Sequence, residues 1–305
     1  MDRVKFTIHS KQSYPIDVKT FEVKTLKKYP YYQESLTGEI AQFAICPECD
    51  NPVQVIGLYK TLANTNTAYG KHYAKPVTGI GIYNKENYLH CPYRAERQSL
   101  TKSNKKQGLD NLAYQVIQRM VLYFDKIVWL LQKEMGLYIS LTLAKQMLDD
   151  FFHSQSYLYK GASLRNMPLV LAYFSLNKGI IGRKVLPTSL ELLKSIREVE
   201  ELYLEGNQIK SHRFSDAGFY FHDHKTHLIN HHLTESLIFT ISKGTGDHVD
   251  KIYEKMICFD NNHIENLLTF EPKHLNEMQK KRNQQLLATA IEIAQEYGFM
   301  NEPDF

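Results

Sequence analysis

A Cys-x-x-Cys pair is the feature that most constrains how this chain of 305 residues can fold. Cys46 and Cys49 stand in the sequence Cys-Pro-Glu-Cys, and this spacing lets both thiolates of one tight turn reach the same zinc ion. The proline fixes one φ angle of the turn in advance, and backbone N–H groups of such a turn stabilise the thiolates. Two cysteines supply half of a tetrahedral site, so two more ligands must come from further along the chain.

The candidates for these two ligands lie between the pair and a second Cys-Pro element. Cys91 belongs to that element and is our first choice for the third ligand. For the fourth we favour His72, because it follows Gly70 in what reads as a tight, glycine-containing turn. His90 is the open alternative, although it adjoins Cys91 and neighbouring residues of an extended chain point to opposite faces. The predicted structural zinc site is Cys46, Cys49, His72 and Cys91.

This segment resembles the broad class of bacterial zinc ribbons and, distantly, the N-terminal ribbon of CoiA-like competence proteins. The likeness covers about residues 41–93 and is carried by Cys46-Pro-Glu-Cys49 with Pro52-Val53 after it. It implies a zinc-held, β-rich module and no particular activity. The rest of the chain has no match to the nuclease motif of that family, so the resemblance implies no nuclease activity.

Hydrophobic periodicity predicts an α+β fold. Alternating residues indicate strands over 3–9 and 16–26 and on both sides of the cysteine turn, at 41–45 and 53–58. Three- and four-residue spacing then indicates a helix from Leu109 to Gly136. Beyond it we expect helices over 139–152, 187–203, 261–270 and 273–297, a buried strand or short helix over 168–174, and strands over 236–244 and 255–259.

These elements suggest a small β-rich zinc-ribbon domain over 1–95, a basic linker over 96–107 and a mixed helical and antiparallel-sheet domain over 108–305. The net charge of +4 permits nucleic-acid binding without requiring it. Cationic and aromatic side chains gather around the ribbon and in the linker, where they can contact phosphates. The predicted nucleic-acid contacts are Lys71, Tyr73, Lys75, Arg94, Arg97, Lys102, Lys105 and Lys106.

A histidine-rich segment is the rival chemical site. If 217–223 and 227–233 form a hairpin that turns at 223–226, His222 and His224 share a face, with His227, His231 and Glu235 on the other arm. Imidazole and carboxylate groups on such a face can bind a divalent metal. The usual ligand signatures are missing, so a plain polar hairpin is the preferred interpretation. The fourth cysteine, Cys258, is expected to be a buried thiol.

Three functions fit these patterns. We favour a binding protein that contacts nucleic acid through the ribbon and linker and a protein partner, or a second copy, through the C-terminal domain. The alternatives are a non-catalytic, zinc-stabilised subunit of a bacterial assembly such as a phage-defence or mobile-element system, and a metal-dependent hydrolase or nuclease that uses the histidine hairpin. We predict no catalytic residue and no cofactor besides Zn²⁺.

The sequence also predicts a cytoplasmic protein without membrane contact. No apolar run approaches the roughly 18 to 20 residues that span a bilayer, and the first nine residues alternate like a strand instead of resembling a signal segment. In a reducing compartment a Cys-x-x-Cys pair holds a metal more often than it forms a disulfide.

Overall fold

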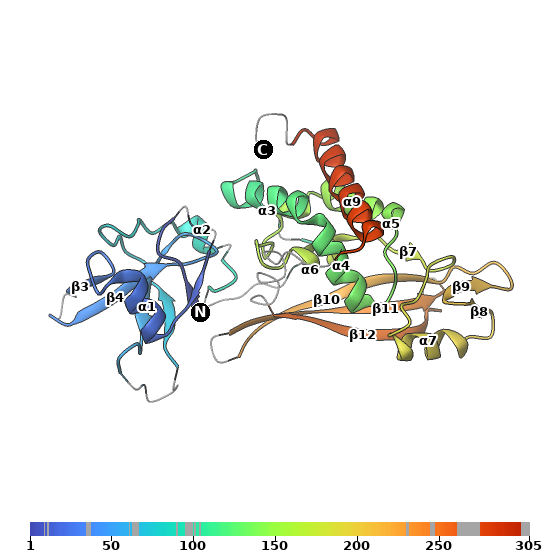
Figure 1. Ribbon diagram of the computed structural model, residues 1–305, viewed down its shortest axis with the longest axis horizontal. Helices are drawn as coiled ribbons and strands as arrows, with labels where there is room; N and C mark the ends of the chain where they lie inside the picture. Colours follow the sequence, from blue (N-terminus) through green and yellow to red (C-terminus); the bar gives the residue numbers. More distant parts are fainter. Residues whose placement is uncertain are drawn as a thin grey trace. The chain divides into compact units, whose positions relative to one another are not determined.

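The chain forms two compact units in a computed structural model (Figure 1). Unit 1 contains residues 1–98 and 226–234, and unit 2 contains residues 99–225 and 235–305. The predicted α+β class is confirmed: antiparallel sheets come first, followed by helices and a further antiparallel sheet. The structure describes residues 1–8, 10, 12–34, 38–60, 62, 67–89, 91–94, 100, 102–103, 105–229, 232–244, 248–260 and 275–299.

Unit 1 is built on an antiparallel sheet of four strands in the order β3-β4-β5-β6. The two strands predicted beside the cysteine turn are confirmed as β4 and β5, and β6 forms an edge of the sheet. A small sheet, β1–β2, and two short helices complete the unit. The elements are β1 (Arg3–Val4), β2 (Tyr14–Pro15), α1 (Val18–Thr25), β3 (Tyr32–Glu34), β4 (Ile40–Ile45), β5 (Pro52–Ile56), β6 (Tyr69–His72) and α2 (Lys85–Leu89).

The strand predicted over 16–26 is wrong, because this segment forms helix α1. The Asp17 side chain accepts a hydrogen bond from the backbone N–H of Thr20, which caps the helix, and Leu26 ends it with a left-handed φ of 52°. The buried residues are Phe21 and Thr25, four positions apart, as on one face of a helix. The cap and this spacing outweigh the alternating valines and threonine that favour a strand. The strand predicted over 3–9 is also shorter than expected, since β1 ends at Val4.

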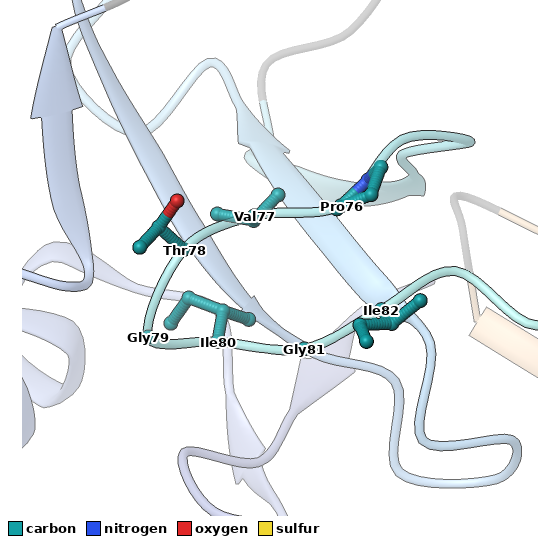
Figure 2. A pocket seen from close by; sticks show the side chains of 7 residues that line it. All are labelled: Pro76, Val77, Thr78, Gly79, Ile80, Gly81 and Ile82. Atoms are coloured by element: carbon teal, nitrogen blue, oxygen red, sulfur yellow. The ribbon is translucent and has the colours of Figure 1, made fainter.

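The two faces of the unit 1 sheet are covered differently. Ala44, Val53 and Val55 lie in one core cluster with Phe21 of α1. Phe43 on the other face belongs to a second cluster with Val77 and Ile80. Val77 and Ile80 belong to a loop over 76–82. Figure 2 shows how this loop turns back at Gly79, with Val77 on one arm and Ile80 on the other, around a shallow apolar hollow. Helix α1 therefore covers one face of the sheet, and the loop over 76–82 covers part of the other.

Unit 2 begins with a group of helices around a large apolar core. The helix predicted from Leu109 to Gly136 is in fact two, because Tyr123 leaves the helical region (φ −121°, ψ 21°) between α3 and α4. Its predicted end is confirmed: Gly136 has φ 72°, and its N–H donates to the carbonyl of Gln132. The predicted 139–152 helix is confirmed as α5. The elements here are α3 (Asn111–Leu122), α4 (Phe124–Met135), α5 (Leu141–His153), the 3₁₀ turn η1 (Ser156–Leu158) and α6 (Met167–Phe174).

The remainder of unit 2 contains most of a sheet in the order β12-β11-β10-β7, a small β8–β9 sheet and two helices; the end of β10 and the start of β11 fall within the 226–234 segment of unit 1. The helix predicted over 187–203 ends early, since α7 stops at Arg197 and β8 follows. Inner residues such as Phe219, Phe239 and Ile257 join the same core as the helices. The predicted 261–270 helix lies outside the described residues. The elements are β7 (Lys178–Gly179), α7 (Leu190–Arg197), β8 (Leu202–Glu205), β9 (Gln208–Ser211), β10 (Gly218–Ile229), β11 (His232–Lys243), β12 (Asp250–Asp260) and α9 (Glu277–Glu296).

The histidine hairpin does not turn where the sequence predicted. Strand β10 continues from Gly218 through Asp223 to Ile229, so the segment expected to be the turn is strand. Asp223 has a left-handed φ of 52° inside this strand. Asp tolerates this conformation better than most residues and is also common in turns. The predicted turn at 223–226 is therefore a local irregularity inside the strand and not its end. In the part of the chain that the structure describes, no helix is long and apolar enough to cross a membrane.

Gly136 offers a test of how α4 ends where it packs against Ser189 at the start of α7. A methyl group there would lie 2.8 Å from Cβ of Ser189 and would require a left-handed backbone. Gly298, after α9, has φ 81° but open space around it. We expect Gly298→Ala to lower the free energy of unfolding by about 1–2 kcal/mol from backbone strain alone. Gly136→Ala should cost at least about 1 kcal/mol more through overpacking. Urea denaturation measures both, and equal losses would contradict this account.

Candidate metal centre

The turn between β4 and β5 places Cys46 and Cys49. The N–H of Cys46 donates to the carbonyl of Asn51 at 2.9 Å, and the N–H of Asp50 donates to the carbonyl of Cys46 at 3.2 Å. Asp50 has a left-handed φ of 59°, which brings the chain back into β5. Its carboxylate forms an ion pair with Lys5, whose side chain is 8% exposed. Both thiols are buried, and the closed turn directs them to one point.

His72 and Cys91 reach this point from separate segments. His72 is the last residue of strand β6 and stands opposite Val53 at the start of β5. The expected reason for choosing His72, a tight turn, is therefore wrong, because Gly70 lies inside the strand. A side chain at Gly70 would collide with Val53, 2.7 Å away, and with Met1. Cys91 follows α2, and its N–H donates to the carbonyl of Tyr88.

The four side chains predicted as ligands lie together. Their ligand atoms are all within 4.8 Å of one another. Sγ of Cys46 and Sγ of Cys91 are 3.6 Å apart, while Nε2 of His72 lies 3.3 Å from Sγ of Cys49 and 3.5 Å from Sγ of Cys91. A tetrahedral zinc ion has S···S edges of about 3.8 Å and S···N edges of about 3.6 Å, given Zn–S bonds of about 2.3 Å and Zn–N bonds of about 2.0–2.1 Å. The cluster can thus hold a metal ion such as zinc. The alternative ligand His90 lies outside the described residues.

The polar residues around the cluster were not identified from the sequence. The Asn51 side chain donates to Sγ of Cys49 at 3.3 Å and to the carbonyl of Asn84 at 3.0 Å, and it accepts from the N–H of Asn84. Asn51 thereby ties the cysteine turn to the chain that leads into α2. The Tyr88 ring of α2 packs edge-on against His72 at 5.0 Å between centroids. The asparagine two residues after the second cysteine was the available sequence signal for the hydrogen bonds that Asn51 makes to Cys49 and Asn84.

The electrostatics of the cluster favour a bound cation. Burial works against a thiolate at Cys46, but hydrogen bonds from Cys49 and Cys91 and the charge of His72 outweigh it, so that the pKa of Cys46 lies well below its ordinary value. Burial, followed by the neighbouring Cys46, raises the pKa of Cys49 and Cys91 well above the ordinary value. Without a cation, burial and the neighbouring Cys46 thus disfavour the thiolate forms of Cys49 and Cys91. A dication supplies the charge that lets all three lose their protons.

The predicted nucleic-acid residues have different surroundings. Lys71 and Lys75 are exposed, and the half-buried Tyr73 ring packs on Phe43 at 5.3 Å between centroids. Arg94 is 9% exposed, and it donates to the carbonyl of Leu89, beside Cys91. Arg97 lies outside the described residues.

The three linker lysines belong to unit 2. Lys106 forms an ion pair with Asp110 at 2.7 Å, and its side chain is 6% exposed. Lys105 donates to Gln155, and Lys102 lies 5.8 Å from the centroid of the Tyr173 ring. Contacts within unit 2 therefore hold Lys106 more firmly than the exposed Lys102 and Lys105.

The histidine-rich segment does not form the shared face that the sequence suggested. Because Asp223 interrupts the alternation of β10, His222 is half exposed beside Thr240, whereas His224 is buried. His224 accepts from the N–H of Leu100 through Nδ1, so Nε2 carries the proton that it shares with Glu235 at 2.8 Å.

His224 and Glu235 are each 1% exposed, and Asn166 also donates to the Glu235 carboxylate. This closed network offers no opening to a substrate. His227 is exposed and His231 lies outside the described residues. Of all the side chains that the structure describes, only the Cys46 cluster has the arrangement of a metal site. Cys258 is exposed, contrary to expectation, on the opposite face of β12 from the buried Ile257 and Phe259.

Comparisons of the chain with protein-family models, with curated proteins and with solved structures find no match. The likeness to CoiA-like ribbons therefore rests on Cys46-Pro-Glu-Cys49 with Pro52-Val53 after it. What the structure establishes is the cluster of three cysteines and one histidine.

Metal analysis tests the cluster directly. We expect the purified chain to contain one zinc ion, and Cys46→Ser to lose it, because three remaining ligands no longer close a tetrahedral structural site. Cys258→Ser is the matched control, since this exposed cysteine is not part of the cluster, and it should keep the metal. Elemental analysis by mass spectrometry gives the zinc content. Equal zinc in the two variants would refute the assignment.

Asn51 offers a test of the surroundings of the cluster. Asn51→Ala removes the hydrogen bond to Cys49 and both contacts to Asn84 but leaves all four ligands in place. Outer-shell partners of this kind typically contribute about 10- to 100-fold to metal affinity. We therefore expect zinc to be lost to a chelator at a concentration at least about tenfold lower than for the unmodified chain. Asn87→Ala, which removes one long contact to the Cys49 carbonyl, should have a smaller effect.

Proposed function

We propose that this chain binds single-stranded nucleic acid through unit 1, and that a structural zinc ion holds this unit in shape. The geometry and charge of the Cys46 cluster support the zinc ion. The observation that carries the nucleic-acid part is a row of three side chains, Tyr69 and Lys71 of β6 and Tyr73 directly after it, which we name the β6 stripe.

The β6 stripe follows from strand geometry. Side chains two residues apart along a strand point to the same face, so a ring, an ammonium group and a second ring lie in line. The register across the sheet agrees, because Lys71 pairs with Gln54 and Gln54 pairs with Phe43, on which Tyr73 packs. Lys71 is exposed and Tyr69 and Tyr73 are half-buried. Their rings are thus supported by the protein and still accessible.

These side chains suit a single strand better than a duplex. Unpaired bases stack on tyrosine rings, each stack contributing about 1–3 kcal/mol, whereas the bases of a duplex are already stacked on one another. Lys71, with the exposed Lys75 beyond it, can neutralise phosphates of the same strand. Arg94 and Lys106 contribute less to this proposal, because a carbonyl and a carboxylate already engage them.

Zinc has a positional role in this proposal. Lys71 of the stripe adjoins the ligand His72, so the zinc ion would fix the end of the strand that carries the stripe. A structural zinc ion contributes about 10 kcal/mol or more to folding. Removing the zinc ion should abolish nucleic-acid binding because unit 1 unfolds, although the ion itself does not contact the nucleic acid.

Fluorescence anisotropy with a labelled single strand and the matching duplex tests the proposal. The zinc-loaded chain should bind the single strand more tightly, with an affinity that falls as salt rises from about 50 to 200 mM. Lys71→Ala should weaken binding several-fold and reduce the slope of log affinity against log salt by about 0.7, as expected for one lost phosphate contact.

Lys19→Ala is the matched control, because this exposed lysine lies on α1, which covers the other face of the sheet. It should leave both affinity and slope close to those of the unmodified chain. Absence of binding to either nucleic acid by the zinc-loaded chain would overturn the proposal. A protein contact would then be the remaining role for the unit.

A further inference from the structure

Unit 2 contains a hollow of 480 Å³ that no part of the proposed function uses. One wall is the segment over 105–109, and the other sides come from η1 and from Phe299 after α9. The first wall is fixed by strand-like pairing, since Lys105 bridges to Tyr159 and the N–H of Lys106 donates to the carbonyl of Leu158. The volume lies within the range of about 300–1,000 Å³ that is usual for small-molecule sites.

Part of the lining of the hollow is apolar and aromatic. Tyr157 and Leu158 line it and are 5% and 7% exposed. The Phe299 ring is held edge-on against Tyr157 at 5.5 Å and stacked on Phe152 at 5.9 Å between centroids. Leu109, half exposed, completes this side. Such a surface accepts a flat ring.

The lining of the hollow also includes the cationic side chain of Lys105. The Lys105 ammonium donates to Oε1 of Gln155 and lies 5.7 Å from the centroid of the Tyr159 ring. Among the described residues, no carboxylate is within ion-pair distance of Lys105, in contrast to Lys106, which is paired with Asp110. Burial raises the pKa of Tyr157, despite an opposing hydrogen bond with Gln155, so its hydroxyl keeps its proton at neutral pH. The lysine and the tyrosine can therefore both donate to an anion.

Gln155, which lines the hollow, has an unusual backbone for a residue with a side chain. Its backbone is left-handed, with φ 53° and ψ 47°, at the start of η1. A residue with a side chain there costs roughly 1–2 kcal/mol, and glycine would remove this strain. The side-chain carbonyl of this strained residue accepts the hydrogen bond from the Lys105 ammonium and so positions the cation. Strain of this kind is typical of functional sites.

We infer that this hollow binds a nucleoside monophosphate group, with the base against Phe299 and Leu109 and the phosphate on Lys105 and the Tyr157 hydroxyl. The inference does not rest on the proposed function, because the site lies in unit 2. The same chemistry is offered by a free nucleotide and by the phosphorylated end of a nucleic-acid strand, and the experiment separates these two sources.

Isothermal titration calorimetry on the full zinc-loaded chain tests the inference. The probes are AMP, GMP, CMP and UMP, a 5′-phosphorylated single strand, adenosine and inorganic phosphate. At least one monophosphate should bind in the micromolar to low-millimolar range, and more tightly than adenosine or phosphate alone. If Lys105→Gln weakens binding of the phosphorylated strand as much as binding of its terminal nucleotide, the source is a strand end; if it weakens the nucleotide alone, the source is a free nucleotide.

Two variants separate binding from folding. Gln155→Gly should raise or preserve the melting temperature, because it removes the strained backbone, and should weaken nucleotide binding several-fold. Lys105→Gln should weaken binding of the monophosphate but not of adenosine. Lys102→Gln is the control, an exposed lysine of the same segment outside the hollow, and should change neither. If no monophosphate binds at millimolar concentration, or if neither pocket variant alters its affinity, the inference is wrong.

Discussion

Three buried thiols and an imidazole at one point are the constraint on which unit 1 depends. Their ligand atoms come from the β4–β5 turn, the end of β6 and the chain after α2, segments that share no continuous element. Burying three thiolates is unfavourable, because they lose their hydration and their charges repel one another. A dication that takes the place of the three thiol protons compensates these charges. A unit of this size has a small core, so a metal ion can supply a large share of its stability.

Individual residues with left-handed backbones determine where several side chains point. Asp50 turns the chain so that both cysteines face one position, and Asp223 separates His222 from His224 onto different sides of β10. In unit 2, the left-handed backbone of Gln155 directs its side-chain amide to Lys105. Each of these is a local departure from regular structure, and none changes the order of helices and strands. The chemistry of this chain is therefore set at single residues on a regular framework.

The same distinction explains what the sequence could predict. Spacing rules identified the cysteine turn, and the glycine at 136 marked the end of α4, because both depend on a few neighbouring residues. Periodicity could not detect the single non-helical residue Tyr123, since the apolar face continues across it. The segment over 16–26 alternates like a strand, yet an Asp17 cap and the burial of Phe21 make it a helix. His72 was selected for a turn that does not exist, and the pairing of β6 with β5 that places it near the cysteines is invisible to local patterns.

That pairing also relates the two proposed features of unit 1. Along β6 and the residue after it, Gly70 and His72 belong to one alternation, and Tyr69, Lys71 and Tyr73 belong to the other. Gly70 is packed against Met1 and Val53, and His72 stands in the metal cluster, so the inner alternation is fixed by close contact and by the ligand geometry. A slip of one residue would exchange the two faces and bring Lys71 to the metal. The cluster of three cysteines and one histidine therefore fixes the register of the edge strand, and the register decides which side chains the strand presents on its other face.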